Sequence, residues 1–177
     1  MTFTQHYDSP LGGILLAADE VGLTGLWFDE EKYFADHLPK EHIEQDSPVL
    51  SQTKQWLDLY FSGSEPDWLP PLHPVGSPFR QAVWKILLQI PYGQTITYGD
   101  IARQLASQQG LTRMSAQAVG GAVGHNEISI IIPCHRVVGA DGSLTGYAGG
   151  IDKKYKLLEL ERADMNQFYI PKKGTAL

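Results

Sequence analysis

The stretch ISIIIPCHRVVG occupies residues 128–139 and holds the only cysteine of the chain, Cys134. Its β-branched run, residues 128–132, ends at Pro133, and this pattern predicts a buried strand that stops abruptly. A thiol at the end of a rigid strand, with the imidazole of His135 beside it, is a candidate nucleophile. The alternative is a structural cysteine, because free cysteine is among the most often buried residue types. The rest of the sequence has to decide between these two interpretations.

The composition is that of an ordinary globular protein, with 177 residues, 42% hydrophobic and 19% charged. No apolar run approaches the length of a membrane span, and the N-terminus lacks the features of a signal peptide. A single cysteine excludes an internal disulfide and fits a reducing compartment. We therefore expect a cytoplasmic protein without a membrane partner.

The charge is divided unevenly along the chain, whose net charge is −6. Residues 1–74 contain three Lys and thirteen Asp or Glu, a net charge of −10. Residues 75–177 contain eleven Lys or Arg and seven Asp or Glu, a net charge of +4. This asymmetry indicates two modules with different partners, and the basic one can face phosphates.

Three short runs in the acidic half alternate with glycine-containing turns, which predicts an antiparallel meander with strands at 3–7, 14–18 and 23–28. An acidic, helix-favouring segment follows from Glu30. A helix is expected over 49–61.

Residues 63–74 contain four prolines and one glycine and are interpreted as a linker. The predicted fold is therefore α+β. An N-terminal α/β support domain spans 1–74, a mainly helical domain spans 75–165, and a tail spans 166–177.

The basic half is expected to begin with three helices, each with its own capping residue. Ser77 caps a helix to residue 90, Thr97 with Asp100 forms a capping box before a helix to about residue 108, and Ser115 caps a helix over 116–123. The second and third helices predict a helix-turn-helix.

A last helix is expected further along, capped by Asp152 and running through Arg162.

The helix at 116–123 is unusually rich in alanine and glycine, which gives it little side chain to pack. One explanation is another backbone that crosses it closely. The other is a surface of small residues that must approach something narrow, such as a DNA minor groove.

The candidate chemistry depends on forming a thiolate, because a free thiol is only a few per cent ionised at neutral pH. His135, Arg136 or a histidine held by a carboxylate can favour the thiolate, and Glu161 on the last predicted helix is one candidate to orient the imidazole. The other histidines have no metal-ligand spacing and there is no second cysteine, so we expect no metal site.

Several further segments share the order and character of one known family. They are YGDIA at 98–102, AVGGA at 118–122, Asn126, PCHRV at 133–137, GYAGG at 146–150 and LLELE at 157–161. Together they resemble the O6-alkylguanine-DNA alkyltransferases, strongly over 75–162 and more loosely over 1–74. The resemblance implies a ribonuclease H-like N-terminal module and a winged helix-turn-helix-like module that carries the active cysteine.

The resemblance also implies roles for five residues. Cys134 would accept the alkyl group, and His135 with Glu161 would form a water-linked relay that yields the thiolate. Tyr98 would turn the phosphate of the damaged nucleotide and donate toward guanine N3. Asn126 would brace the turn between the helix-turn-helix and the active site.

Other matching positions would contact DNA or the flipped base. Tyr147 would line the guanine pocket, and the backbones of Val137 and Ala148 would hydrogen-bond the base. The full expected set is Tyr98, Gln117, Ala118, Gly121, Arg136, Val137, Tyr147 and Ala148.

Two positions depart from the family pattern. Gln117 stands where the family usually has Arg, the residue that fills the duplex after the base flips out, and it brings no charge. The family often has Ser where this chain has Ala148. The segment 106–114 is also longer than in familiar relatives, and Arg113 is a candidate to replace the missing charge.

The implied function is repair of O6-alkylguanine, and of O4-alkylthymine, in double-stranded DNA by one irreversible transfer to the protein's own cysteine. Such a protein needs no cofactor and acts as a monomer. Two other functions are weighed against it. A lesion sensor without transfer activity would replace the cysteine, whereas Cys134 is present. A Cys-His hydrolase would require an oxyanion hole and would turn over repeatedly.

Overall fold

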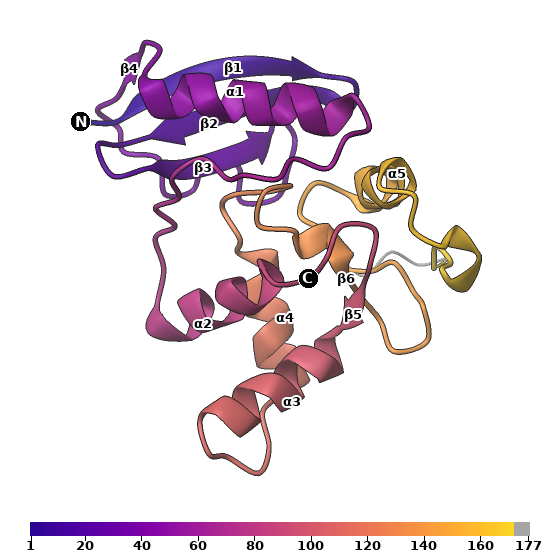
Figure 1. Cartoon of the computed structure of the whole chain (residues 1–177). Helices are drawn as coiled ribbons and strands as arrows, with labels where there is room; N and C mark the ends of the chain where they lie inside the picture. The colour runs from indigo at the N-terminus through magenta and orange to yellow at the C-terminus, as the bar shows by residue number, and fades with distance from the viewer. Residues whose placement is uncertain (172–177) are drawn as a thin grey trace. The chain divides into compact units, whose positions relative to one another are not determined.

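A computed structural model of the chain describes residues 1–171 (Figure 1). The chain divides into two compact units. Unit 1 contains Met1–Val75 together with Glu127–Ile131, and unit 2 contains Gly76–Asn126 and the described residues from Ile132 onward. The α+β fold is as predicted, with the sheet in the N-terminal part and the helices concentrated in the C-terminal part. No helix among residues 1–171 is long and apolar enough to cross a membrane.

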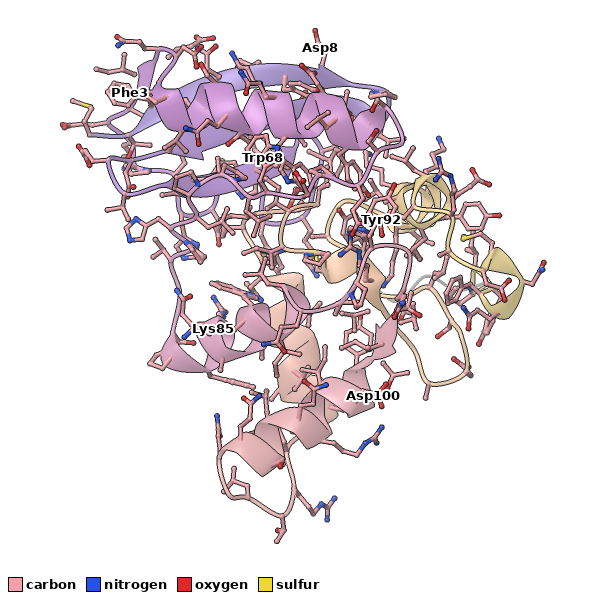
Figure 2. All side chains as sticks on the ribbon, in the orientation of Figure 1. Phe3, Asp8, Trp68, Lys85, Tyr92 and Asp100 are labelled. Carbon is pink, nitrogen blue, oxygen red and sulfur yellow. The ribbon has the colours of Figure 1, made fainter. Side chains whose placement is uncertain are left out.

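Unit 1 is built on a four-stranded sheet with the order β3-β2-β1-β4. The predicted meander is confirmed, since β1 (Phe3–Ser9), β2 (Gly12–Ala18) and β3 (Leu23–Phe28) pair antiparallel in sequence order. Phe3 and Asp8 lie toward the two ends of β1 in Figure 2. The fourth strand, β4 (Ile43–Glu44), pairs parallel with β1 and is too short to have shown a sequence pattern.

Helix α1 (Pro48–Phe61) packs across β1, β2 and β3 (Figure 1). It begins at Ser47, whose side chain accepts a hydrogen bond from the backbone N–H of Leu50. Its buried residues are Leu50, Thr53, Trp56, Leu57 and Tyr60. The predicted helix is therefore confirmed, one residue longer at its N-terminus.

A second apolar cluster of unit 1 contains Leu15, Ala17 and Trp27, with Ala35 and Leu38 packed against it. The acidic segment after β3 that supplies Ala35 and Leu38 forms turns, although its composition favours a helix. The backbone explains this difference, because Tyr33 and Ala35 have φ of 63° and 52°, outside the right-handed helical region.

The segment predicted to be a linker is hydrogen-bonded to the sheet of unit 1. The backbone N–H of Leu23 in β3 donates to the carbonyl of Pro71 at 2.8 Å, and the N–H of His73 donates to the carbonyl of Leu23 at 2.7 Å. The proline-rich segment therefore lies along β3 as part of unit 1.

The predicted buried strand at 128–132 is wrong. The segment is buried throughout, but it forms turns, with one isolated bridge between Ile128 and Leu26. Ile130 has φ of 71°, which no strand residue adopts. A continuous apolar run is equally compatible with a strand or with a buried turn, so the pattern alone could not separate the two. Cys134 therefore begins a 3₁₀-helix, η1 (Cys134–Arg136), and does not end a strand.

Unit 2 contains α2 (Pro78–Leu87), α3 (Tyr98–Gln108) and α4 (Ala116–Gly124), which pack against one another. The predicted caps at Ser77, Thr97 and Ser115 are all confirmed, including the capping box with Asp100, labelled in Figure 2. Helix α2 ends three residues earlier than predicted. A short parallel pair, β5 (Ile96–Thr97) and β6 (Val137–Val138), was not predicted.

The last long helix, α5 (Ile151–Leu160), begins after Gly150 with no side-chain cap, so the predicted cap at Asp152 is wrong. Asp152 instead lies in the first turn, where a carboxylate complements the helix dipole.

A 3₁₀-helix, η2 (Met165–Gln167), follows α5. In the described part of the predicted tail, the backbone of Tyr169 hydrogen-bonds to Gly142 and Leu144. Residues 172–177 of the predicted tail lie outside the described residues.

Candidate active site

The thiol of Cys134 is buried, with 5% of the residue exposed. The side-chain amide of Asn126 donates to Cys134 Sγ at 3.3 Å and to the carbonyl of Ile132 at 2.8 Å. Asn126 thus connects the end of α4 to the residues just before the cysteine. An N–H donor aimed at sulfur favours the charged form of a thiol.

The imidazole of His135 is fully buried and its Nε2 lies 2.6 Å from Glu161 Oε2. Burial lowers the pKa of His135, and this outweighs the opposing effect of Glu161. The neutral ring therefore donates its Nε2 proton to the carboxylate, and its Nδ1 carries a free lone pair. Within the described residues, Nδ1 has no hydrogen-bond partner, so it is available to accept a proton.

The carboxylate of Glu161 accepts hydrogen bonds from at least four donors among the described residues. Besides His135, it accepts from Arg136 Nε at 2.8 Å, Arg136 Nη2 at 3.1 Å and the backbone N–H of Gly93 at 3.1 Å. Burial alone would raise the pKa of Glu161, but the hydrogen bonds from His135 and Arg136 and the positive charge of Arg136 lower it overall. Glu161 is therefore a buried carboxylate that remains ionised.

Two features of the local backbone make this arrangement possible. Glu161 is the C-cap residue of α5, immediately after the helix in which it was expected. Gly93 has φ of 76°, and a Cβ there would lie 2.9 Å from the carbonyl oxygen of Glu161. The turn after α2 can approach the end of α5 this closely because residue 93 is glycine.

Arg136 belongs to this buried group. The sequence groups it with the DNA-binding residues, but it is only 9% exposed, and its Nη1 donates to the carbonyl of Ile90 at 2.7 Å. Its guanidinium also lies over the ring of Tyr92, at 5.7 Å (Tyr92 is labelled in Figure 2). The structure thus gives Arg136 protein partners and makes it the counter-ion of Glu161.

Lys154 is a fully buried cation that the sequence analysis missed. Its Nζ donates to the carbonyls of Val137 and Thr145, the latter at 2.7 Å, and lies 6.0 Å from the ring centre of Tyr98. Burial lowers the pKa of Lys154 to about 8, and the negative charge of Cys134 opposes this change. The sequence did contain a signal for this burial. Lys154 lies three residues after Ile151 and four before Leu158, which places it on the apolar face of α5.

The two tyrosines expected at the site are both in unit 2. Tyr98 donates its hydroxyl to the carbonyl of Thr145 at 3.1 Å, and burial raises the pKa of its phenol, with the charge of Cys134 acting in the same direction. Tyr98 therefore keeps its proton at neutral pH. Tyr147 is 7% exposed, and its ring meets that of His135 edge to face at 6.4 Å.

Val137 and Ala148, whose backbones were expected to hydrogen-bond the base, differ in their exposure. Val137 is buried in β6, and its carbonyl already accepts from Lys154. Ala148 is partly exposed in the turn before α5.

Three expected residues, Gln117, Ala118 and Gly121, are exposed on α4. Their neighbours Val119, Gly120, Ala122 and Val123 are buried. A Cβ at Gly121 would meet no described atom within 4 Å, so packing within the protein does not require a glycine there. The exposed side of helix α4 is therefore a surface of small side chains with open space above Gly121.

Family models match both parts of the chain. The ribonuclease-like domain of 6-O-methylguanine DNA methyltransferase matches residues 3–72, and the DNA-binding domain of the same enzyme matches residues 78–163. The chain belongs to the 6-O-methylguanine DNA methyltransferase family. The resemblance inferred from the sequence is thereby confirmed, and the DNA-binding model contains every residue of the buried group around Cys134.

Similar relatives carry the name methylated-DNA–protein-cysteine methyltransferase. The protein of Haemophilus influenzae is 40% identical over 89% of this chain and 84% of its own length. That of Mycobacterium tuberculosis is 44% identical over 89% of this chain and 93% of its own.

Two solved structures of the family share the fold. The structure of Mycobacterium tuberculosis OGT in complex with DNA is 41% identical, covers 94% of each chain and has a TM-score of 0.76. An O6-methylguanine DNA methyltransferase of Methanococcus jannaschii is 30% identical, covers 96% of this chain and 99% of its own, and has a TM-score of 0.59.

Proposed function

We propose that this chain repairs alkylated DNA by moving the alkyl group from O6 of guanine to Sγ of Cys134. The observation that carries this proposal is the buried group of unit 2, in which one thiol lies beside an amide donor and interacts with a buried lysine. Family membership and the names of the relatives support the same reaction.

The thiol proton leaves through His135. Its Nδ1 has the free lone pair, and Glu161 fixes the ring through Nε2. A water molecule is expected to link Sγ and Nδ1, as the family resemblance implies. As the proton moves, the imidazolium that forms lies against an ionised carboxylate, which stabilises the charge.

Two groups stabilise the thiolate that remains. Asn126 donates to the sulfur, and Lys154 provides a positive charge that interacts with Cys134. Neither group needs to reorganise when the charge develops, which is the property of a preorganised site.

The sulfur then attacks the alkyl carbon in line with the C–O bond. A C–S bond forms, the C–O bond breaks, and the electron pair of that bond stays with guanine, which takes a proton. Tyr98 keeps its phenolic proton and is the proposed donor toward guanine N3, for which its hydroxyl has to turn away from the carbonyl of Thr145. Water does not readily hydrolyse the resulting thioether, so each molecule reacts once.

Access to a stacked base requires flipping it out of the duplex, at a cost of a few kcal/mol. We assign the minor-groove contact to the exposed side of α4, formed by Gln117, Ala118 and Gly121, because its small side chains permit close approach. Tyr147 and the backbones of Val137 and Ala148 are the proposed base pocket. Arg113, also exposed and just before α4, is the cation nearest in sequence to Gln117.

The remaining assignments rest on the family resemblance. The domain at 75–165 would bind DNA and the one at 1–74 would support it, with the protein acting as a monomer. O4-alkylthymine would be a second substrate. A free thiol must persist, which favours a reducing compartment such as the cytoplasm.

Intact-mass measurement after incubation with an O6-methylguanine duplex tests the proposal. We expect one added methyl group per molecule, located on Cys134, and none in Cys134→Ser, which still binds the duplex. Repeated turnover of a thioester substrate would instead indicate a Cys-His hydrolase, and tight binding without a mass change would indicate a lesion sensor. Methyl transfer that persists in Cys134→Ser would overturn the assignment.

A further inference from the structure

A histidine and two carboxylates meet in unit 1, apart from the chemistry assigned to Cys134. Asp36, His37 and Glu127 each direct one ligand atom to the same place, and these atoms all lie within 4.8 Å of one another. Glu127 comes from the segment Glu127–Ile131, and the other two come from the turns after β3. Within the described residues, this is the only such group of three or more His, Cys, Asp or Glu side chains.

Glu127 is the fixed member of the group. It is only 4% exposed, and its two oxygens have different partners. Oε2 accepts from the indole Nε1 of Trp27 at 2.6 Å, and Oε1 lies 2.7 Å from His37 Nδ1. A carboxylate oriented by a hydrogen bond on one oxygen, with the other oxygen facing an imidazole, has the outer-shell support found around metal ligands.

The chain around His37 is also held in place. Ala35 and Leu38, on either side of it, pack against the cluster that contains Trp27, and the ring of Phe34 meets Trp27 edge to face at 6.2 Å. The same indole therefore positions both Glu127 and the turn that carries His37. Asp36 and His37 themselves are exposed, so an ion can reach them from solvent.

We propose that Asp36, His37 and Glu127 form a binding site for a first-row transition-metal cation, with Zn²⁺ as the expected occupant. Imidazole with carboxylate oxygens suits zinc, and three protein ligands leave a fourth position for water. Mg²⁺ and Ca²⁺ are less favourable occupants, because these ions prefer a ligand set made only of oxygen atoms. This site offers one imidazole nitrogen and only one buried carboxylate.

The geometry requires only a small adjustment. Zinc bonds of about 2.0–2.2 Å at tetrahedral angles place two ligand atoms roughly 3.3 Å apart. The 2.7 Å contact between His37 and Glu127 must open slightly as the metal replaces the proton between them. The ligand atom of Asp36 lies within 4.8 Å of the other two and must also move closer to reach bonding distance, which its exposed side chain allows. Burial raises the pKa of Glu127, so a bound cation would also offset the cost of burying its negative charge.

This proposal departs from the expectation that the chain has no metal site. That expectation was drawn from spacing along the sequence, and His37 and Glu127 are 90 residues apart. The folding of the segment Glu127–Ile131 into unit 1 is what brings them together. A bound metal would tie this segment to the turns after β3.

The test is a zinc titration of metal-free full-length protein against a chromophoric chelator, with Co²⁺ absorption as a second readout. Wild type and Cys134→Ser are expected to bind one equivalent equally well, because the thiol is not a ligand. His37→Ala and Asp36→Asn should each weaken binding at least tenfold, as should Glu127→Gln. Zinc should raise the Tm of wild type but not of His37→Ala.

The matched control is His73→Ala. His73 Nδ1 lies 2.7 Å from Asp19 Oδ2, so this pair reproduces the His–carboxylate contact without belonging to a group of three. Its removal should leave zinc binding unchanged. If Glu127→Gln fails to fold, the exposed Asp36 and His37 variants decide the result. Binding that is lost in Cys134→Ser or His73→Ala but retained in His37→Ala, or no binding at millimolar zinc, would overturn the proposal.

Discussion

Replacing Glu161 with Gln tests whether the buried group of unit 2 is one electrostatic unit. Among the described residues, the carboxylate accepts at least four hydrogen bonds, from His135, Gly93 and two nitrogens of Arg136, at 2.6–3.1 Å. The amide of Gln has one acceptor oxygen, and its NH₂ group faces donors. Glu161→Gln therefore leaves the guanidinium of Arg136 without its counter-charge.

The expected loss of stability follows from that burial. Breaking a buried ion pair by removing one partner costs about 3–5 kcal/mol. The rate of alkyl transfer should fall by about 100-fold or more, the usual contribution of a positioned general base, because His135 loses the group that holds its ring. Both effects should appear together, since both originate in one carboxylate.

The assay combines urea unfolding with single-turnover transfer from an O6-methylguanine duplex, measured well below the Tm so that the variant is folded. Glu159→Gln is the matched control, because Glu159 is exposed on the same helix. Glu159→Gln should change neither the free energy of unfolding nor the rate of alkyl transfer appreciably. An unfolding free energy within about 0.5 kcal/mol of wild type for Glu161→Gln, the range of ordinary surface substitutions, would refute the reasoning.

The pH dependence has a definite sign. Folding lowers the pKa of Glu161, so the folded state stabilises the ionised carboxylate. Its stabilising contribution is fully present above the unfolded-state pKa of about 4.3 and is lost as the pH falls below that value. The difference in unfolding free energy between wild type and Glu161→Gln should therefore become smaller as the pH is lowered. A difference in stability that stays constant down to pH 3 would contradict this assignment.

Other substitutions separate the chemistry from DNA binding. Lys154→Met should slow transfer at least tenfold at pH 7 with little change in Tm. The substitution loses two hydrogen bonds, but it also removes a buried ammonium group. The lowered pKa of that group, about 8, corresponds to a burial cost of about 3 kcal/mol, which offsets the loss. Gln117→Arg should tighten duplex binding and steepen its salt dependence by about one unit of slope, while the reaction with free O6-benzylguanine stays unchanged. Loss of duplex repair in Arg113→Ala, with Gln117→Ala like wild type, would move the intercalating role to Arg113. Gly121→Leu should keep or raise the Tm, since leucine favours helix, but weaken duplex binding at least tenfold in a gel-shift assay.

The sequence by itself determined the local elements with strong chemical signals. Ser77, Thr97 and Ser115 identified three helix starts because a capping side chain acts on N–H groups two or three residues away, within the reach of local inspection. The glycine-separated strands of the meander were likewise local. The segment at 128–132 failed because burial on all sides gives the same apolar pattern for a strand and for a turn.

The sequence also indicated part of the candidate site. Motif order along the chain pointed to Cys134, His135 and Glu161 and to the family, since a linear pattern can carry that information. The pairing of Arg136 with Glu161, a contact between residues 25 apart, was not visible, and neither was the burial of Lys154.

Tertiary structure alone decided which charges are buried and what they face. The contact between His37 and Glu127 joins two positions 90 residues apart, and no spacing rule along the chain could have indicated it. The physical reason is that the energy of a buried charge depends on its neighbours in space and on their exclusion of water. Neither quantity is a property of the residue or of its neighbours in sequence.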